Sequence, residues 1–132
     1  MAMLETHLAH LTPNERAALE ELVNRLRRHY REDLLHVVLF GSKARGDFDQ
    51  ESDLDVLVVV RQILDSTYWE HRRAIIRETY DLELAHNVVF SLLVRDEPEY
   101  DQMRRWNLLI YRNIKQDGIE LWTSRPSEPQ FA

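Results

Sequence analysis

The chain has 132 residues, of which 44% are hydrophobic and 30% charged, as in an ordinary soluble domain. It contains no cysteine, which excludes disulfides, thiolate metal sites and a cysteine nucleophile, and its formal charge of −6 disfavours a protein that holds duplex nucleic acid. No apolar run approaches the ~20 residues of a membrane-spanning helix, and the N-terminus does not resemble a signal peptide. We therefore expect a cytoplasmic protein with a single domain over residues 1–123 and a flexible tail over residues 124–132.

Residues 11–33 have the pattern of a long amphipathic helix. Thr12 and Glu15 have the spacing of a capping box, and Pro13 lies where a first-turn proline is tolerated. Apolar residues recur at helical spacing and predict one buried stripe: Leu19, Leu22, Val23, Leu26 and Tyr30. The arginines that flank this stripe are interpreted as a solvated face: Arg25, Arg27, Arg28 and Arg31.

Short β-branched and apolar runs predict the strands. Residues 36–40 end at a glycine, as a buried strand should, and residues 54–60 are continuous enough for a central strand covered on both faces. Residues 87–94 predict a third strand, and residues 119–122 are compatible with a short edge strand.

Helical periodicity returns in three later segments, residues 65–86, 97–106 and 107–118, the last closed by Gly118 as a C-cap. In the first of these, the expected inward positions are Trp69, Ile75 (or Ile76), Tyr80 and Leu84. Trp69, Trp106 and Trp122 are expected to fill the core or an interface rather than to stack on bases. The order of elements predicts a two-layer α+β domain, a small mixed sheet backed by helices on one face.

The stretch GSKARGDFDQESDLD, residues 41–55, contains the candidate metal-ligating and phosphate-binding residues. Because alternate residues of a strand share a face, Asp53 and Asp55 emerge side by side, with Cα atoms about 6.5–7 Å apart. Two like charges there are costly unless a cation lies between them, and hard oxygen ligands suit Mg²⁺ or Mn²⁺. Such metals can serve phosphoryl or nucleotidyl transfer.

The Gly-Ser step at the start of this stretch adds a phosphate site. Gly41 allows a phosphate to approach the backbone closely, and the following turn can donate hydrogen bonds together with the Ser42 hydroxyl. Lys43 and Arg45 add local positive charge, and Arg45 has the better geometry for phosphate oxygens. Either feature alone is common in proteins, but together they predict a nucleotide–metal site.

These residues resemble the G-S-x10-D-x-D signature of the DNA polymerase β-like nucleotidyltransferases, specifically the minimal nucleotidyltransferases. The resemblance extends through most of the chain to NIKQDGIEL, residues 113–121. It implies the polymerase β-like fold and transfer of a nucleoside monophosphate, usually from ATP, onto a protein or small-molecule hydroxyl. It further implies that Gly41 and Ser42 hold the triphosphate, that Asp53 and Asp55 ligate Mg²⁺ or Mn²⁺, and that Arg45 contacts phosphate.

The same resemblance points to a protein partner. It implies a toxin–antitoxin pair in which this chain is the antitoxin and a HEPN-type protein is the toxin. Self-association into a homo-oligomer is left open by the sequence. A third reading, nucleotide transfer to an aminoglycoside-like drug, usually needs an added helical domain for which this chain has little room.

One departure from the family pattern concerns the third expected strand. Members of the family usually carry a third carboxylate there, whereas Ser91 is its only interior polar residue. A neutral hydroxyl is a poor Mg²⁺ ligand and a poor base. Glu83 and Asp96 are weaker candidates for the missing group because neither has the expected strand placement. The alternative function is therefore a catalytically degenerate module that binds nucleotide or a HEPN partner without turnover.

Overall fold

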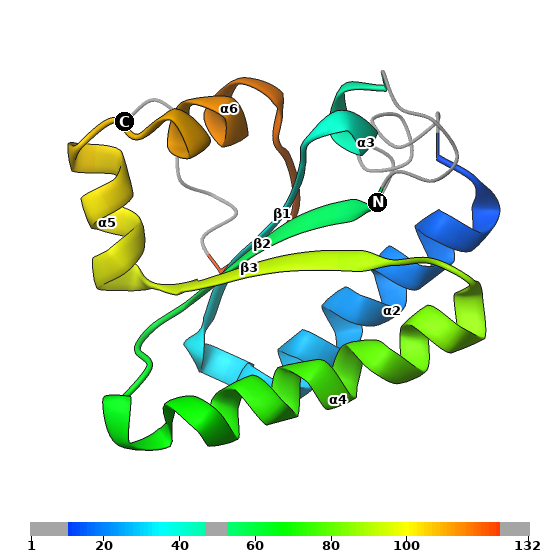
Figure 1. The fold of residues 1–132 in the computed structure, drawn as a ribbon, viewed down its shortest axis with the longest axis horizontal. Helices are drawn as coiled ribbons and strands as arrows, with labels where there is room; N and C mark the ends of the chain where they lie inside the picture. Colours follow the sequence, from blue (N-terminus) through cyan, green and yellow to red (C-terminus); the bar gives the residue numbers. More distant parts are fainter. Residues whose placement is uncertain (1–10, 47–52, 125–132) are drawn as a thin grey trace.

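The computed structural model describes residues 11–46 and 53–124 of the chain, arranged as a mixed four-stranded sheet with helices packed against it (Figure 1). The strands are β1 (Leu34–Phe40), β2 (Leu54–Val60), β3 (Phe90–Asp96) and β4 (Ile119–Thr123), in the spatial order β3-β2-β1-β4. β1 pairs antiparallel with both β2 and β4, and β2 pairs parallel with β3. The expected mixed sheet and the α+β class are confirmed, whereas the expected tail from residue 125 onward lies outside the described residues.

The helices are α2 (Pro13–Tyr30), α3 (Ser42–Arg45), α4 (Tyr68–His86), α5 (Glu97–Arg105) and α6 (Leu109–Asp117). Single 3₁₀ turns at Arg31–Asp33 and Asp65–Thr67 precede β1 and α4. Gly118 ends α6 by donating its N–H to the Ile114 carbonyl, in an extended rather than a left-handed conformation. Within the described ranges, no helix combines the length and apolar character needed to cross a membrane.

α2 begins and ends for local reasons. The Thr12 hydroxyl accepts from the Glu15 N–H at 3.1 Å, and the Glu15 carboxylate accepts from the Thr12 N–H at 2.9 Å, which confirms the capping box. Four of the five predicted stripe residues are buried, and Tyr30 is half-buried. The helix ends where Arg31 takes a φ of 53° and a ψ of −121°, a conformation that L-residues rarely adopt.

The sheet is covered on both faces. Val58 and its alternate neighbours face the larger core, which α2 and α4 complete. Leu57 and Val59 point the other way and pack with Ile114 of α6, against which Tyr100 of α5 is partly buried. The prediction that β2 is central and covered on both faces is therefore confirmed. The expectation of helices on a single face was too simple, because this second set of β2 side chains also needs an apolar cover.

α4 docks through a different stripe from the one expected. Ile75 is buried as predicted, but its inward companions are Thr79 and Leu82, whose burial the sequence pattern did not indicate. Four apolar residues instead face solvent, with exposed fractions above one half: Trp69, Ile76, Tyr80 and Leu84. α4 carries apolar residues on two sides, and the side with Ile75 and Leu82 packs against α2 and the sheet. Thr79 can be buried on that side because its hydroxyl donates a hydrogen bond to the Ile75 carbonyl.

The tryptophans differ from one another in burial. Trp69 and Trp106 are largely exposed, so neither belongs to the core of the described chain, and a place in an interface stays a prediction for both. Trp122 is half-buried at the end of β4, where the Arg27 guanidinium lies over its ring.

A buried ion pair joins α3 to α2. Lys43 is 1% exposed, and its ammonium group pairs with the second carboxylate oxygen of Glu15. Lys43 therefore points into the protein and does not add the charge beside the Gly-Ser turn that the sequence suggested. Burial acts to raise the pKa of Glu15, but the Lys43 ammonium and the Thr12 N–H outweigh it and hold that pKa below its usual 4.5.

Substituting Glu15→Gln is expected to destabilise the protein by about 3 kcal/mol at pH 7, because Lys43 then stays buried without a counter-charge. Since the folded-state pKa of Glu15 is lowered, the stabilisation from the pair is fully present above 4.5 and is lost as the pH falls through the folded-state pKa. Urea unfolding at pH 7 and at decreasing pH measures both effects.

Glu20→Gln is the matched control, because Glu20 is an exposed residue of the same helix. It should change the unfolding free energy by less than about 0.5 kcal/mol. Equal effects of the two substitutions would contradict a structural role for the buried pair.

Candidate active site

Three strand ends bring the predicted site residues together at one end of the sheet. In the antiparallel pair, Phe40 at the end of β1 lies opposite Asp55, and Gly41 follows directly. In the parallel pair, Asp55 lies beside Ser91 at the start of β3. Phe40, Asp55 and Ser91 therefore lie in one row across β1, β2 and β3, with Gly41 directly after β1 and Asp53 directly before β2.

Gly41 is required by its surroundings. Its φ of 75° and ψ of −160° lie in a region that favours glycine. A Cβ atom at this position would lie 2.3 Å from Oδ2 of Asp55, so a side chain would collide with the carboxylate. The Gly41 carbonyl accepts from the N–H groups of Ala44 and Arg45, both at 3.1 Å, which folds Ser42–Arg45 into the short helix α3.

The surroundings of Asp55 disfavour the negative charge of its carboxylate. Burial raises its pKa, and the negative charge of Asp53 raises it further. The hydrogen bond with the Ser91 side chain and the charge of Arg45 act in the opposite direction but do not cancel the rise. A divalent cation would remove this penalty, so the two carboxylates present fit such an ion as ligands.

Arg45 is exposed on α3, and its guanidinium lies 3.8 Å from Oδ2 of Asp117 at the end of α6. The sequence analysis gave Asp117 no role, although it lies in the segment that carries the family resemblance. No motif rule would have found this contact, because it depends on how α6 packs over the sheet. The contact shows that Arg45 lies near Asp117, and the Arg45 side chain stays accessible.

The third carboxylate is absent from the described site. Glu83 accepts from the Phe90 N–H at 2.9 Å, and Asp96 caps α5 and accepts from the Ile63 N–H, so both candidates are committed to backbone groups. Within residues 11–46 and 53–124, no cluster of three or more acidic or histidine side chains could hold a metal. Ser91 occupies the strand position beside Asp55, as the sequence suggested.

Substituting Gly41→Ala is expected to destabilise the protein by about 1–3 kcal/mol, through the positive φ and the collision with the Asp55 carboxylate. Chemical denaturation measures this. In an Asp55→Ala background the collision is removed, so the same substitution should cost less. An equal cost in both backgrounds would contradict the close approach of Asp55 to Gly41.

Comparison with known proteins identifies relatives along most of the sequence. A family model described as "Nucleotidyltransferase domain" matches residues 19–120. A Methanocaldococcus jannaschii protein named "Putative protein adenylyltransferase MJ0604" is 34% identical over 109 residues, which cover 83% of this chain and 99% of that protein. A second protein of that organism, "Putative protein adenylyltransferase MJ0141", is 34% identical over 64 residues, 48% of this chain and 62% of that protein.

Solved structures share the fold. A protein from Sulfolobus solfataricus described as a "putative nucleotidyltransferase" matches with a TM-score of 0.54 and 22% identity, over 83% of this chain and 80% of that chain. A toxin–antitoxin with AMP-PNP matches with a TM-score of 0.52 and 20% identity, over 81% of this chain and 75% of that chain. The toxin–antitoxin MntA-HpeT, in a mutant form, matches with a TM-score of 0.51 and 22% identity, over 81% and 74%. At identities of 20–22%, these structures show only that the fold is shared. The family model and the first relative carry the further conclusion that this chain belongs to the nucleotidyltransferase domain family.

Proposed function

We infer that this nucleotidyltransferase moves AMP from ATP onto a hydroxyl group of a protein, in a reaction that depends on Mg²⁺ or Mn²⁺. The observation that carries the proposal is the Asp55 carboxylate, held against Gly41 and beside Asp53 with its charge only partly compensated. The relatives named as protein adenylyltransferases support this choice of acceptor over an aminoglycoside-like drug. We place the reaction in the cytoplasm, where ATP is available.

The residues have distinct roles in this proposal. Gly41 and Ser42 hold the triphosphate, because the chain turns there without a side chain that would block close approach. Arg45, accessible on α3, contacts phosphate oxygens. Asp53 and Asp55 would hold the divalent cation, which supplies positive charge against the negative charge that develops on the phosphates.

In the transfer step the acceptor hydroxyl oxygen forms a bond to the α-phosphorus and gives up its proton to solvent water. The bond from that phosphorus to the bridging oxygen of the β-phosphate breaks, and pyrophosphate leaves along the Gly41-Ser42 turn. Asp53 and Asp55 would act on the reacting phosphate only through the divalent cation that they hold, which would supply positive charge against the phosphate oxygens. Ser91, a neutral hydroxyl, orients Asp55 through its hydrogen bond and is a poor base for the acceptor proton.

The acceptor in this proposal is a partner protein of the HEPN type, as in a toxin–antitoxin pair. Exposed apolar side chains support a protein partner, because four of them follow one side of α4: Trp69, Ile76, Tyr80 and Leu84. Contiguous apolar surface of this kind marks interaction sites. Two structures of the same fold are toxin–antitoxin assemblies, which agrees with this proposal.

A second candidate function rests on Ser91. If two carboxylates hold the cation too weakly for turnover, the chain is a module that binds nucleotide, or the HEPN partner, without transferring the nucleotide. The hydroxyl beside Asp55, where the family usually has a carboxylate, favours this alternative.

Transfer is tested with ATP labelled at the α-phosphate, Mg²⁺ and the protein encoded beside this chain. We expect label on that neighbour, and we expect Asp53→Asn and Asp55→Asn each to lower the labelling about 100-fold or more. Because burial and Asp53 disfavour the charge on Asp55, Asp55→Asn should leave the stability in EDTA equal or higher, which shows that the loss is not misfolding. ATP binding without any label transfer would refute catalysis and support the second function.

Substituting Ser91→Asp is expected to tighten Mn²⁺ binding about tenfold, measured by calorimetry, because it adds a third charged oxygen ligand beside Asp55. If the wild type already turns over, labelling should also become faster. Ser91→Ala is the control, since it removes the hydrogen bond to Asp55 without adding charge. No gain in metal affinity with aspartate at this position would show that position 91 does not face the cation.

A further inference from the structure

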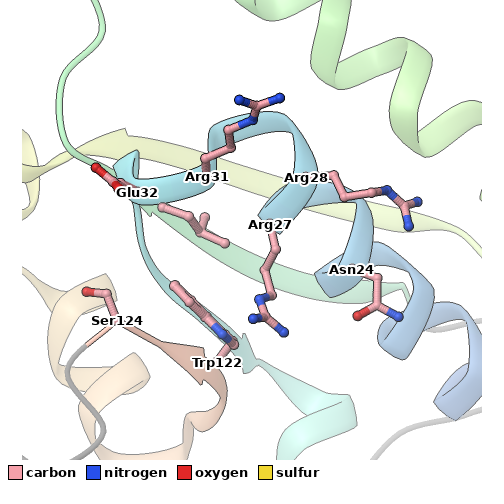
Figure 2. Close-up of a pocket in the computed structure, with 8 residues that line it drawn as sticks. Asn24, Arg27, Arg28, Arg31, Glu32, Trp122 and Ser124 are labelled. Atoms are coloured by element: carbon pink, nitrogen blue, oxygen red, sulfur yellow. The ribbon is translucent and has the colours of Figure 1, made fainter.

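A cavity lies at the opposite end of β1 from the candidate active site. Figure 2 shows it between the C-terminal end of α2, which carries Arg27, and the end of β4 at Trp122. Leu34 at the start of β1 also lines it. Its volume is about 570 Å³, within the roughly 300–1,000 Å³ usual for small-molecule sites. Leu34 and the Trp122 ring give it an apolar side, and Arg27, Arg28 and Arg31 give it a cationic one, to which Glu32 adds a single carboxylate.

The positive charge of the three arginines at this cavity is only weakly compensated by carboxylates. Figure 2 shows Arg27 reaching toward Trp122, over whose ring its guanidinium lies at 5.5 Å, while Arg28 and Arg31 extend outward from the helix. Arg28 is 3.6 Å from an exposed carboxylate of Glu21, a contact that contributes little. Among the described residues, no carboxylate lies within ion-pair distance of Arg27 or Arg31, so both can turn toward a bound anion.

Arg31 occupies a position that its backbone conformation disfavours. Its φ of 53° and ψ of −121° are rare for any residue with a side chain, and glycine would adopt them without strain. The helix dipole favours cationic side chains such as Arg27 and Arg28 near the C-terminal end of α2. It does not explain why an arginine takes the strained backbone position after the helix, or why the Trp122 ring lies against Arg27. Strained non-glycine residues concentrate at sites with a function.

We propose that this cavity binds a nucleotide at a second site, separate from the candidate active site. Arginine side chains hold phosphate through paired N–H donors, and the Trp122 ring with its overlying guanidinium offers planar surfaces for a base. Asn24 and Ser124 add neutral hydrogen-bonding groups at the rim. The net charge of −6 repels an extended polyanion, whereas a single nucleotide responds mainly to charges within the ~10 Å screening length.

The test is calorimetric titration of the full chain with AMP in EDTA, using the Asp53→Asn/Asp55→Asn variant so that metal-dependent binding at the candidate active site is absent. We expect saturable binding of one AMP per chain. In the same background, Arg27→Gln/Arg31→Gln should weaken it at least about tenfold, and adenosine or inorganic phosphate alone should bind more weakly than AMP. Absence of saturable AMP binding would overturn the proposal.

The matched control is Arg105→Gln/Arg112→Gln, which removes the same charge from exposed positions of α5 and α6. It should leave the AMP affinity unchanged within about twofold. An equal loss in both double variants would show that AMP responds only to net charge and would overturn a site at α2. Because no transfer is measured, these results do not depend on whether the chain adenylylates a partner.

Arg31→Gly separates ligand binding from a structural role. Glycine relieves the positive φ, so chemical denaturation should show a protein that is more stable than the parent. AMP binding should nevertheless weaken several-fold because a guanidinium is lost. Increased stability with unchanged AMP affinity would overturn the role of Arg31 in the site.

Discussion

The pairing register between β1 and β2 is the constraint on which the candidate site depends. It sets Phe40 opposite Asp55, so the first residue after β1 meets an aspartate carboxylate, and only glycine fits there. The same carboxylate is half-buried, lies near Asp53 and shares a hydrogen bond with Ser91, and these surroundings disfavour its charge. A shift of one residue in this register would turn Asp55 to the opposite face and separate the two halves of the motif.

The features that could be predicted from the sequence are local ones. The capping box at Thr12 and the bounds of β2 follow from interactions among neighbouring residues, and the structure agrees with both. Asp53 lies just before β2, close enough for its charge to raise the pKa of Asp55. The family resemblance added the position beside Asp55, where Ser91 does lie. The chemical roles of the site residues remain predictions from the resemblance and from the charge around Asp55.

What could not be predicted depends on tertiary packing. The sequence predicts that Lys43, which follows the Gly-Ser step, adds local positive charge there, but Lys43 is buried and pairs with Glu15, 28 positions earlier. α4 carries apolar residues on two sides, and periodicity alone cannot tell which side α2 and the sheet will cover. The arginines of α2 were grouped as one solvated face, yet Arg25 pairs with Glu21 while its neighbours line a cavity against Trp122.

The ion pair between Glu15 and Lys43 affects where the smallest working unit of this protein can begin. The family match starts at residue 19, after the glutamate that anchors the turn following β1. A fragment cut at that border, for transplantation into a fusion or for recombination with a relative, would keep the whole Gly-Ser and Asp-x-Asp motif. It would leave a buried ammonium without its counter-ion, so a usable module has to include Thr12 and the first turn of α2.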